Sequence, residues 1–130
     1  MKNNNPLNLR RTGWLWQGLT SRQNDPEYYQ FRNPAYGYRA AFMTLRLMVW
    51  KMGRTTLAQL LKEWAPDADG RDGQLYTARV CALTGLTPRT LVNPLDANLM
   101  IPIVAAISRI EQGKRPCMLD VLAGWRIYQG

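Results

Sequence analysis

The chain has 130 residues, of which 46% are hydrophobic and 20% charged, so it is expected to fold as one globular domain and an intrinsically disordered chain is excluded. Its 17 basic and nine acidic residues give a net charge of +8, which favours an anionic partner such as nucleic acid, acidic lipid or bacterial cell wall. The absence of histidine excludes Ser-His and Cys-His nucleophilic sites and histidine-ligated zinc, so an enzyme of this composition would depend on carboxylates for acid–base chemistry.

Residues 1–33 are predicted to form a small antiparallel β-region. One residue lies between Trp14 and Trp16, and one lies between Tyr29 and Phe31. Glycines and asparagines separate these apolar pairs along the chain. Such alternation between turn residues is typical of short strands. The N-terminus, MKNNNPLNLR, lacks the apolar stretch of a signal peptide, and the longest apolar run, 99–107, is too short to cross a bilayer. The protein is therefore expected in the cytoplasm unless a particle carries it out.

Residues 34–130 are predicted to form a helical bundle. Asn33 followed by Pro34 is typical of a helix start, and Gly53 indicates where that helix stops. Thr56 and Gln59 have the spacing of a capping box, which starts a second helix. The remaining helices are expected over residues 73–84, 96–112 and 118–128, with Pro102 bending the fourth.

The whole chain, 1–130, is thus expected to be a single domain, mainly α with a small N-terminal antiparallel β-region. The β-region should pack over the bundle, with Trp14 or Trp16 buried against Phe42 and Leu45. Between the second and third helices, the loop DADGRD brings three aspartates together at 67, 69 and 72. Their spacing does not match a helix-loop-helix calcium site, so we expect one N-cap and two solvated acids.

Glu111 is the candidate general acid. It is placed on the last turn of a predicted apolar helix, where the negative end of the helix dipole disfavours an ionised carboxylate. Neighbouring apolar residues would add a desolvation effect of the same sign, as a general acid requires. Arg109, Lys114 and Arg115 act in the opposite direction, so a plain surface glutamate remains the alternative. Among the N-terminal aromatics, Trp16 and Tyr29 are candidates for stacking on sugars or nucleobases, and packing is the alternative.

Seven short motifs follow one another along the chain: NNNPLNLR at 3–10, WQG at 16–18, YYQF at 28–31, YGYRAAF at 36–42, WAP at 64–66, YTARV at 76–80 and EQG at 111–113. The series resembles a family of small phage and prophage proteins labelled virion or structural proteins, over residues 3–116. Members often carry histidine before this glutamate and asparagine after it, where this chain has Ile110 and Gln112. The resemblance implies a location in the cytoplasm of the bacterial host or in the virion.

Residues 1–33 are also similar to the β-region of bacterial cell-wall glucosaminidases. In such lysozyme-like enzymes, a helix ending in E-S-G carries the catalytic glutamate and precedes the strands, whereas here a helix ending in E-Q-G follows them. The similarity implies a lysozyme-like α+β domain, most economically a circularly permuted one, in which Glu111 takes the place of the catalytic acid.

The resemblance therefore implies an enzyme that cleaves the glycan strand of peptidoglycan, either a lysozyme-like hydrolase or a lytic transglycosylase, with Glu111 as general acid and without a metal or other cofactor. Asp25 or Glu27 would assist as a second carboxylate. The residues expected to bind the sugar are Asn8, Trp16, Tyr29 and Tyr76. The alternative is a non-enzymatic virion structural protein that binds the cell wall or other virion proteins. Nucleic-acid binding is not expected, because the chain has no motif for it.

Overall fold

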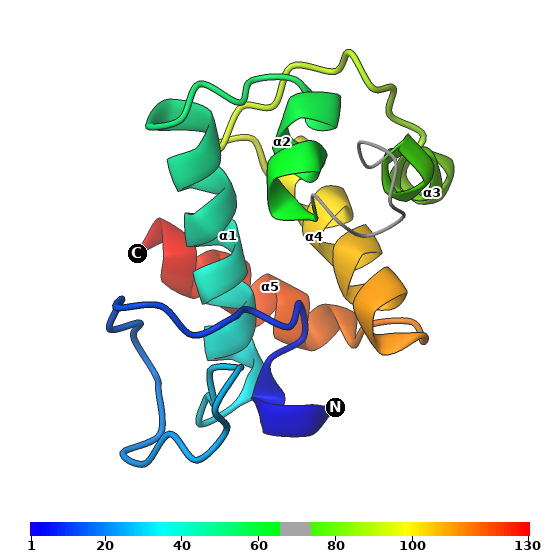
Figure 1. The fold of residues 1–130 in the computed structure, drawn as a ribbon. Coiled ribbons are helices and arrows are strands. Elements are labelled where there is room, and N and C mark those ends of the chain that lie inside the picture. Colours follow the sequence, from blue (N-terminus) through cyan, green and yellow to red (C-terminus); the bar gives the residue numbers. More distant parts are fainter. Residues whose placement is uncertain (66–73) are drawn as a thin grey trace.

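The computed structural model describes residues 1–65 and 74–130, and its regular structure in these ranges is helical (Figure 1). After a short 3-10 turn, η1 (Lys2–Asn4), the helices are α1 (Pro34–Trp50), α2 (Leu57–Trp64), α3 (Gln74–Thr84), α4 (Ala97–Gln112) and α5 (Met118–Gln129). Helix α5 packs most extensively on α1 and also contacts α4. None of the helices in the described part of the chain is long and apolar enough to span a membrane.

The helix boundaries follow the local signals in the sequence. The Asn33 side chain accepts a hydrogen bond from the backbone N–H of Tyr36, and Pro34 is the first helical residue of α1. At the start of α2, Thr56 and Gln59 form both hydrogen bonds of the predicted capping box. Helix α4 continues through Pro102 and ends at Gly113, which has a left-handed backbone with φ 72°. The predicted helix positions are therefore confirmed.

The predicted N-terminal β-region is wrong. Residues 1–33 contain η1, turns and two isolated antiparallel bridges, Arg10 with Tyr28 and Leu19 with Phe31, and the described residues contain no strand. Asn3, Asn4 and Asn8 have positive φ, a left-handed conformation that interrupts a strand. The fold is all-α, and the α+β, lysozyme-like assignment, permuted or not, is overturned with the sheet on which it rested.

Side-chain amides replace sheet hydrogen bonds in this segment. The Asn5 side chain is buried; its oxygen accepts from the Leu9 N–H at 2.8 Å, and its Nδ2 donates to the carbonyls of Leu9 and Tyr29, both at 3.0 Å. Alternating apolar residues can therefore be buried here without a ladder of paired strands. Leu9, Tyr29 and Phe31 pack with Ala40 of α1, and Leu7 reaches the main core.

The tryptophan packing prediction is also wrong. Trp14 is 56% exposed, and Trp16 is partly buried beside Leu9 and Tyr29 rather than against Phe42. The C-terminal helix takes the predicted place, because the rings of Trp125 and Tyr128 lie 5.1 and 5.6 Å from the Phe42 ring. Both aromatic residues of α5 thus complete the core around α1, and of the two N-terminal tryptophans only Trp14 is largely exposed.

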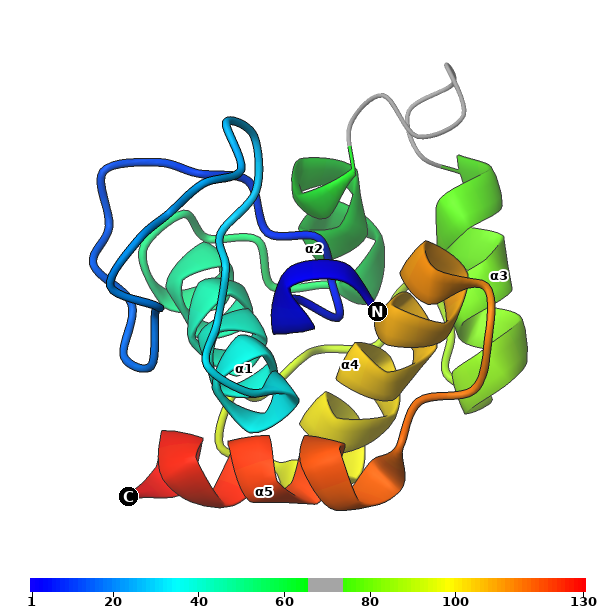
Figure 2. The same cartoon turned by 90° about the horizontal axis from the view of Figure 1, so that it is seen from below.

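Gly37 of α1 lets the N-terminal segment lie directly on the helix (Figure 2). A Cβ atom at this position would come 2.5 Å from the backbone oxygen of Asn4 and 2.6 Å from Cδ of Pro6. Any larger residue must therefore push the segment outward or bend the helix.

We expect Gly37→Ala to lower the free energy of unfolding by about 1–3 kcal/mol, because the steric overlap outweighs the better helix propensity of alanine. Urea unfolding measures this change. Gly13→Ala is the matched control, since a Cβ at Gly13 meets no atom within 4 Å. Equal stabilities of the two variants would contradict the close packing at Gly37.

Candidate functional site

The Glu111 carboxylate is held by two neutral hydrogen-bond donors from distant parts of the chain. Oε1 accepts from the Asn8 side-chain amide at 3.0 Å, and Oε2 accepts from the Tyr76 hydroxyl at 3.0 Å. Helix α4 places Glu111 on its last turn, where the helix dipole disfavours negative charge. The two donors offset that effect and fix the orientation of the carboxylate. Glu111 is therefore a positioned group, partly buried, and not a freely moving surface charge.

Asn8 reaches Glu111 because the N-terminal segment is folded tightly. Its φ of 53° lies in the left-handed region, and the backbone N–H of Asn8 bonds the Asn5 carbonyl at 3.1 Å. The neighbouring Gln112 adds a second link, since its Nε2 donates to the Pro6 carbonyl at 2.9 Å. The end of α4 and the N-terminal segment thus hold each other in place.

Glu111 and Asn8 line a cleft of about 970 Å³ between the N-terminal segment, α1 and α2. Its wall includes apolar and aromatic side chains from all three elements, together with two cations and a second carboxylate. These lining residues include Trp14, Trp16, Tyr28 and Tyr29 from the N-terminal segment, Leu47 and Met48 from α1, Trp64 from α2, and the charged Arg10, Lys51 and Glu63. A cleft of this size with an aromatic wall and few charged groups is typical of a small-molecule or sugar site.

Trp14 and Trp16 form an aromatic surface on one side of this cleft. Their ring centroids are 5.9 Å apart and the rings are tilted by 25°, so they stack on each other. The buried Tyr29 holds their loop: its hydroxyl donates to the Trp14 carbonyl at 2.8 Å and accepts from the Thr12 N–H at 3.1 Å. Tyr29 also lines the cleft, and its hydroxyl holds the backbone that carries Trp14.

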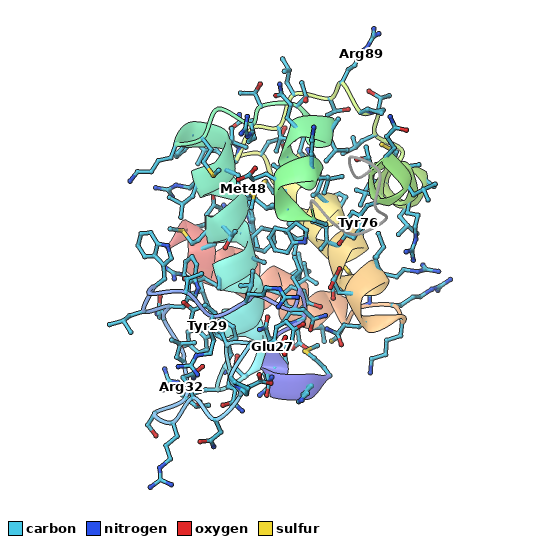
Figure 3. The ribbon with its side chains drawn as sticks, viewed as in Figure 1. Glu27, Tyr29, Arg32, Met48, Tyr76 and Arg89 are labelled. Atoms are coloured by element: carbon cyan, nitrogen blue, oxygen red, sulfur yellow. The ribbon has the colours of Figure 1, made fainter. Side chains whose placement is uncertain are left out.

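The predicted site residues divide into three groups. Glu111, Asn8, Trp16 and Tyr29 line the same cleft. Tyr76 is buried, is not among the cleft-lining residues and binds Glu111 itself. Asp25 and Glu27 do not line the cleft either; they border a second, smaller hollow beside η1. Figure 3 shows Glu27 in the N-terminal segment, apart from Tyr76.

Asp25 and Glu27 have structural partners of their own. The Asp25 carboxylate accepts from the backbone N–H groups of Glu27 and Tyr28 and from the Asn3 amide. These bonds, the Glu27 N–H first, lower the pKa of Asp25 from 3.8 to about 2. Glu27 forms an exposed ion pair with Arg10 at 3.3 Å. Their predicted assisting role is not tested by these contacts and remains a prediction.

Several cleft residues were missed by sequence reasoning. Glu63 of α2 lines the cleft, is partly exposed and pairs with Arg54 at 3.8 Å. Trp64 follows it in the WAP motif, which was the only signal in the sequence for this part of the wall. Met48, near the end of α1, packs partly buried on the core, and Lys51 directly follows the helix; nothing in their local sequence marks them as cleft residues.

No metal site is found in the described ranges, since no three histidine, cysteine, aspartate or glutamate side chains come together there. The three aspartates at 67, 69 and 72 lie outside the described residues, so the predicted N-cap in that loop is not tested.

The chain is similar to a known phage protein. It is 29% identical to Protein P5 of Pseudoalteromonas phage PM2 over 123 residues, which cover 92% of this chain and 74% of the phage protein. No protein-family model matches the chain. The phage association inferred from the motifs is thus supported over nearly the whole length.

We expect Asp25→Asn to destabilise the protein at neutral pH and much less in acid. The pKa of Asp25 is lowered in the folded state, so the ionised carboxylate stabilises the fold above its ordinary value of 3.8, and this contribution is lost as the pH falls toward 2. Thermal unfolding from pH 7 to pH 2 measures the effect. A difference in Tm between variant and parent that stays constant over this range would contradict it.

Proposed function

We propose that the protein cleaves the glycan strand of bacterial peptidoglycan, with Glu111 as the general acid. The observation that carries the proposal is the position of Glu111: the carboxylate lines a cleft of about 970 Å³ and is oriented by two hydrogen bonds. Cleavage of a glycosidic bond needs a carboxylic acid that protonates the leaving oxygen, and it needs neither histidine nor a metal.

The composition of the cleft supports a carbohydrate ligand. Sugar rings present apolar faces that pack on indoles, and Trp14 is 56% exposed beside Trp16. Arg10 and Lys51 line the same cleft, and the chain carries a net charge of +8. Peptidoglycan bears carboxylates on its peptides, so positive potential at the cleft favours its approach.

Similarity to a phage protein is consistent with this activity, because a phage must pass the bacterial wall at entry and at release. An enzyme carried by the virion would meet the wall at entry, whereas one made in the host cytoplasm would reach the wall once the cytoplasmic membrane is breached. A non-enzymatic virion protein is the second candidate. It is favoured by exposed apolar side chains outside the cleft, such as Leu119 on α5, which is 79% exposed and could contact other virion proteins.

We expect Glu111→Gln to reduce wall degradation by about 10²–10⁴-fold, because the amide keeps the shape of the side chain but cannot transfer the proton. Turbidity loss of purified walls and a zymogram measure the activity. Asp120→Asn on α5 is the matched control and should keep the activity, since Asp120 does not line the cleft and has no predicted role in catalysis. If Glu111→Gln degraded walls at the parental rate, the general-acid role would be refuted. A parent protein that binds walls without degrading them would favour the structural role.

We expect Trp14→Ala to weaken binding to purified walls by about three- to tenfold, the scale of one aromatic stacking contact. Co-sedimentation with walls measures the binding, in the Glu111→Gln background so that the walls stay intact. Trp50→Ala is the matched control, because Trp50 is 53% exposed and is not among the cleft-lining residues. Equal losses in both variants would point to a nonspecific aromatic effect and against a sugar platform.

A further inference from the structure

The hydroxyl of Tyr76 links Glu111 to a tryptophan. It donates to Glu111 Oε2 at 3.0 Å, and the Trp64 side chain hydrogen-bonds the same hydroxyl. An indole N–H can only donate, so the Tyr76 oxygen accepts from Trp64 and its single proton is directed to Glu111. Burial, followed by the charge of Glu111, raises the pKa of Tyr76 far above its ordinary range, so the hydroxyl keeps its proton.

The two oxygens of Glu111 therefore have different surroundings. Oε2 faces Tyr76, which is 5% exposed and does not line the cleft. Oε1 faces the side-chain amide of Asn8, which does line the cleft. A proton on Oε2 would leave the Tyr76 hydroxyl without its acceptor, whereas the Asn8 amide can turn and present its own oxygen to a proton on Oε1.

We propose that Tyr76, oriented by Trp64, is a positioning residue that confines the exchangeable proton of Glu111 to Oε1, the oxygen at the cleft. This role rests on the proposed function. The Oε1 proton passes to the glycosidic oxygen as the bond from that oxygen to the anomeric carbon breaks, and Glu111 becomes ionised. Water then adds its oxygen to the anomeric carbon and returns one proton to Glu111. The hydrogen bond from Tyr76 strengthens as the carboxylate charge develops.

Other charged groups lie around the cleft, beside Tyr76 or near Glu111 in the chain. Among the described residues, the charged groups in the cleft wall besides Glu111 are Arg10 from the N-terminal segment, Lys51 after α1 and Glu63 from α2. The charge of Arg79 of α3 acts on Tyr76. Close to Glu111 in the chain are Arg109, Lys114 and Arg115. Tyr76→Phe keeps all of them and removes one hydroxyl. A change in the titration of Glu111 in this variant therefore reports the hydrogen bond and not the surrounding charge.

The test is a carbon-13 NMR titration of the glutamate carboxyl groups. The chain has three glutamates, Glu27, Glu63 and Glu111, so each gives one resonance, and Glu27→Gln and Glu111→Gln assign them. In Tyr76→Phe we expect the Glu111 midpoint to move to higher pH by about one unit, since a donor to the charged form is lost. Glu27 and Glu63 should not move. Trp64→Phe should shift Glu111 in the same direction by less, and it carries the test if Tyr76→Phe does not fold.

Wall degradation provides the second measurement. The alkaline limb of the pH–activity profile should move up with the Glu111 midpoint in Tyr76→Phe, while the maximal rate falls about tenfold or more and co-sedimentation with walls is unchanged. An unmoved midpoint in both folded variants would overturn the inference whatever the activity. A shifted midpoint in a parent that never degrades walls would support the hydrogen-bond arrangement and refute the proposed function, so the two failures are distinguishable.

Discussion

The hydrogen bond between Asn8 and Glu111 joins residues 103 positions apart, and the cleft depends on it. One wall of the cleft is the N-terminal segment, which contains no regular sheet and no helix beyond η1. Such a segment keeps its shape only where side chains fix it. The links from Asn8 and Gln112 attach it to the end of α4, and Gly37 allows it to lie flat on α1. The candidate acid is thus also a structural anchor of the wall beside it.

This dual role has an energetic consequence. A carboxylate at the C-terminal end of a helix is unfavourable unless hydrogen bonds offset the dipole. Here the donors are an amide and a phenol, both neutral, and no ion pair to Glu111 is found among the salt bridges of the described residues. A neutral setting lets the group gain and lose a proton without breaking a salt bridge. The same two hydrogen bonds also fix the orientation of the carboxylate, whereas the carboxylate of a solvated surface glutamate rotates freely.

The asparagines of the N-terminal segment explain how an all-α domain can carry such a wall. Asn5 satisfies backbone groups of Leu9 and Tyr29 with its own amide, while Asn3, Asn4 and Asn8 adopt positive φ at modest cost. Apolar residues between them can then be buried against α1 and the core. The segment leaves Trp14 exposed and Trp16 partly buried beside Leu9 and Tyr29, while α5 supplies Trp125 and Tyr128 to the core around Phe42.

The sequence by itself determined the helices, since caps and stop signals act within a few residues. The absence of histidine restricted acid–base chemistry to the nine carboxylates, and the resemblance of the motifs made Glu111 the candidate among them. It could not separate strands from an amide-fixed loop, because both show the same alternation of apolar residues. Only the tertiary structure placed Tyr76 behind Glu111, Glu63 in the cleft and Asp25 outside it. The placements of Tyr76 and Glu63 depend on how α2, α3 and α4 pack together, and that of Asp25 depends on the folding of the N-terminal segment. Contacts between residues 35 or 103 positions apart leave no local trace in the chain.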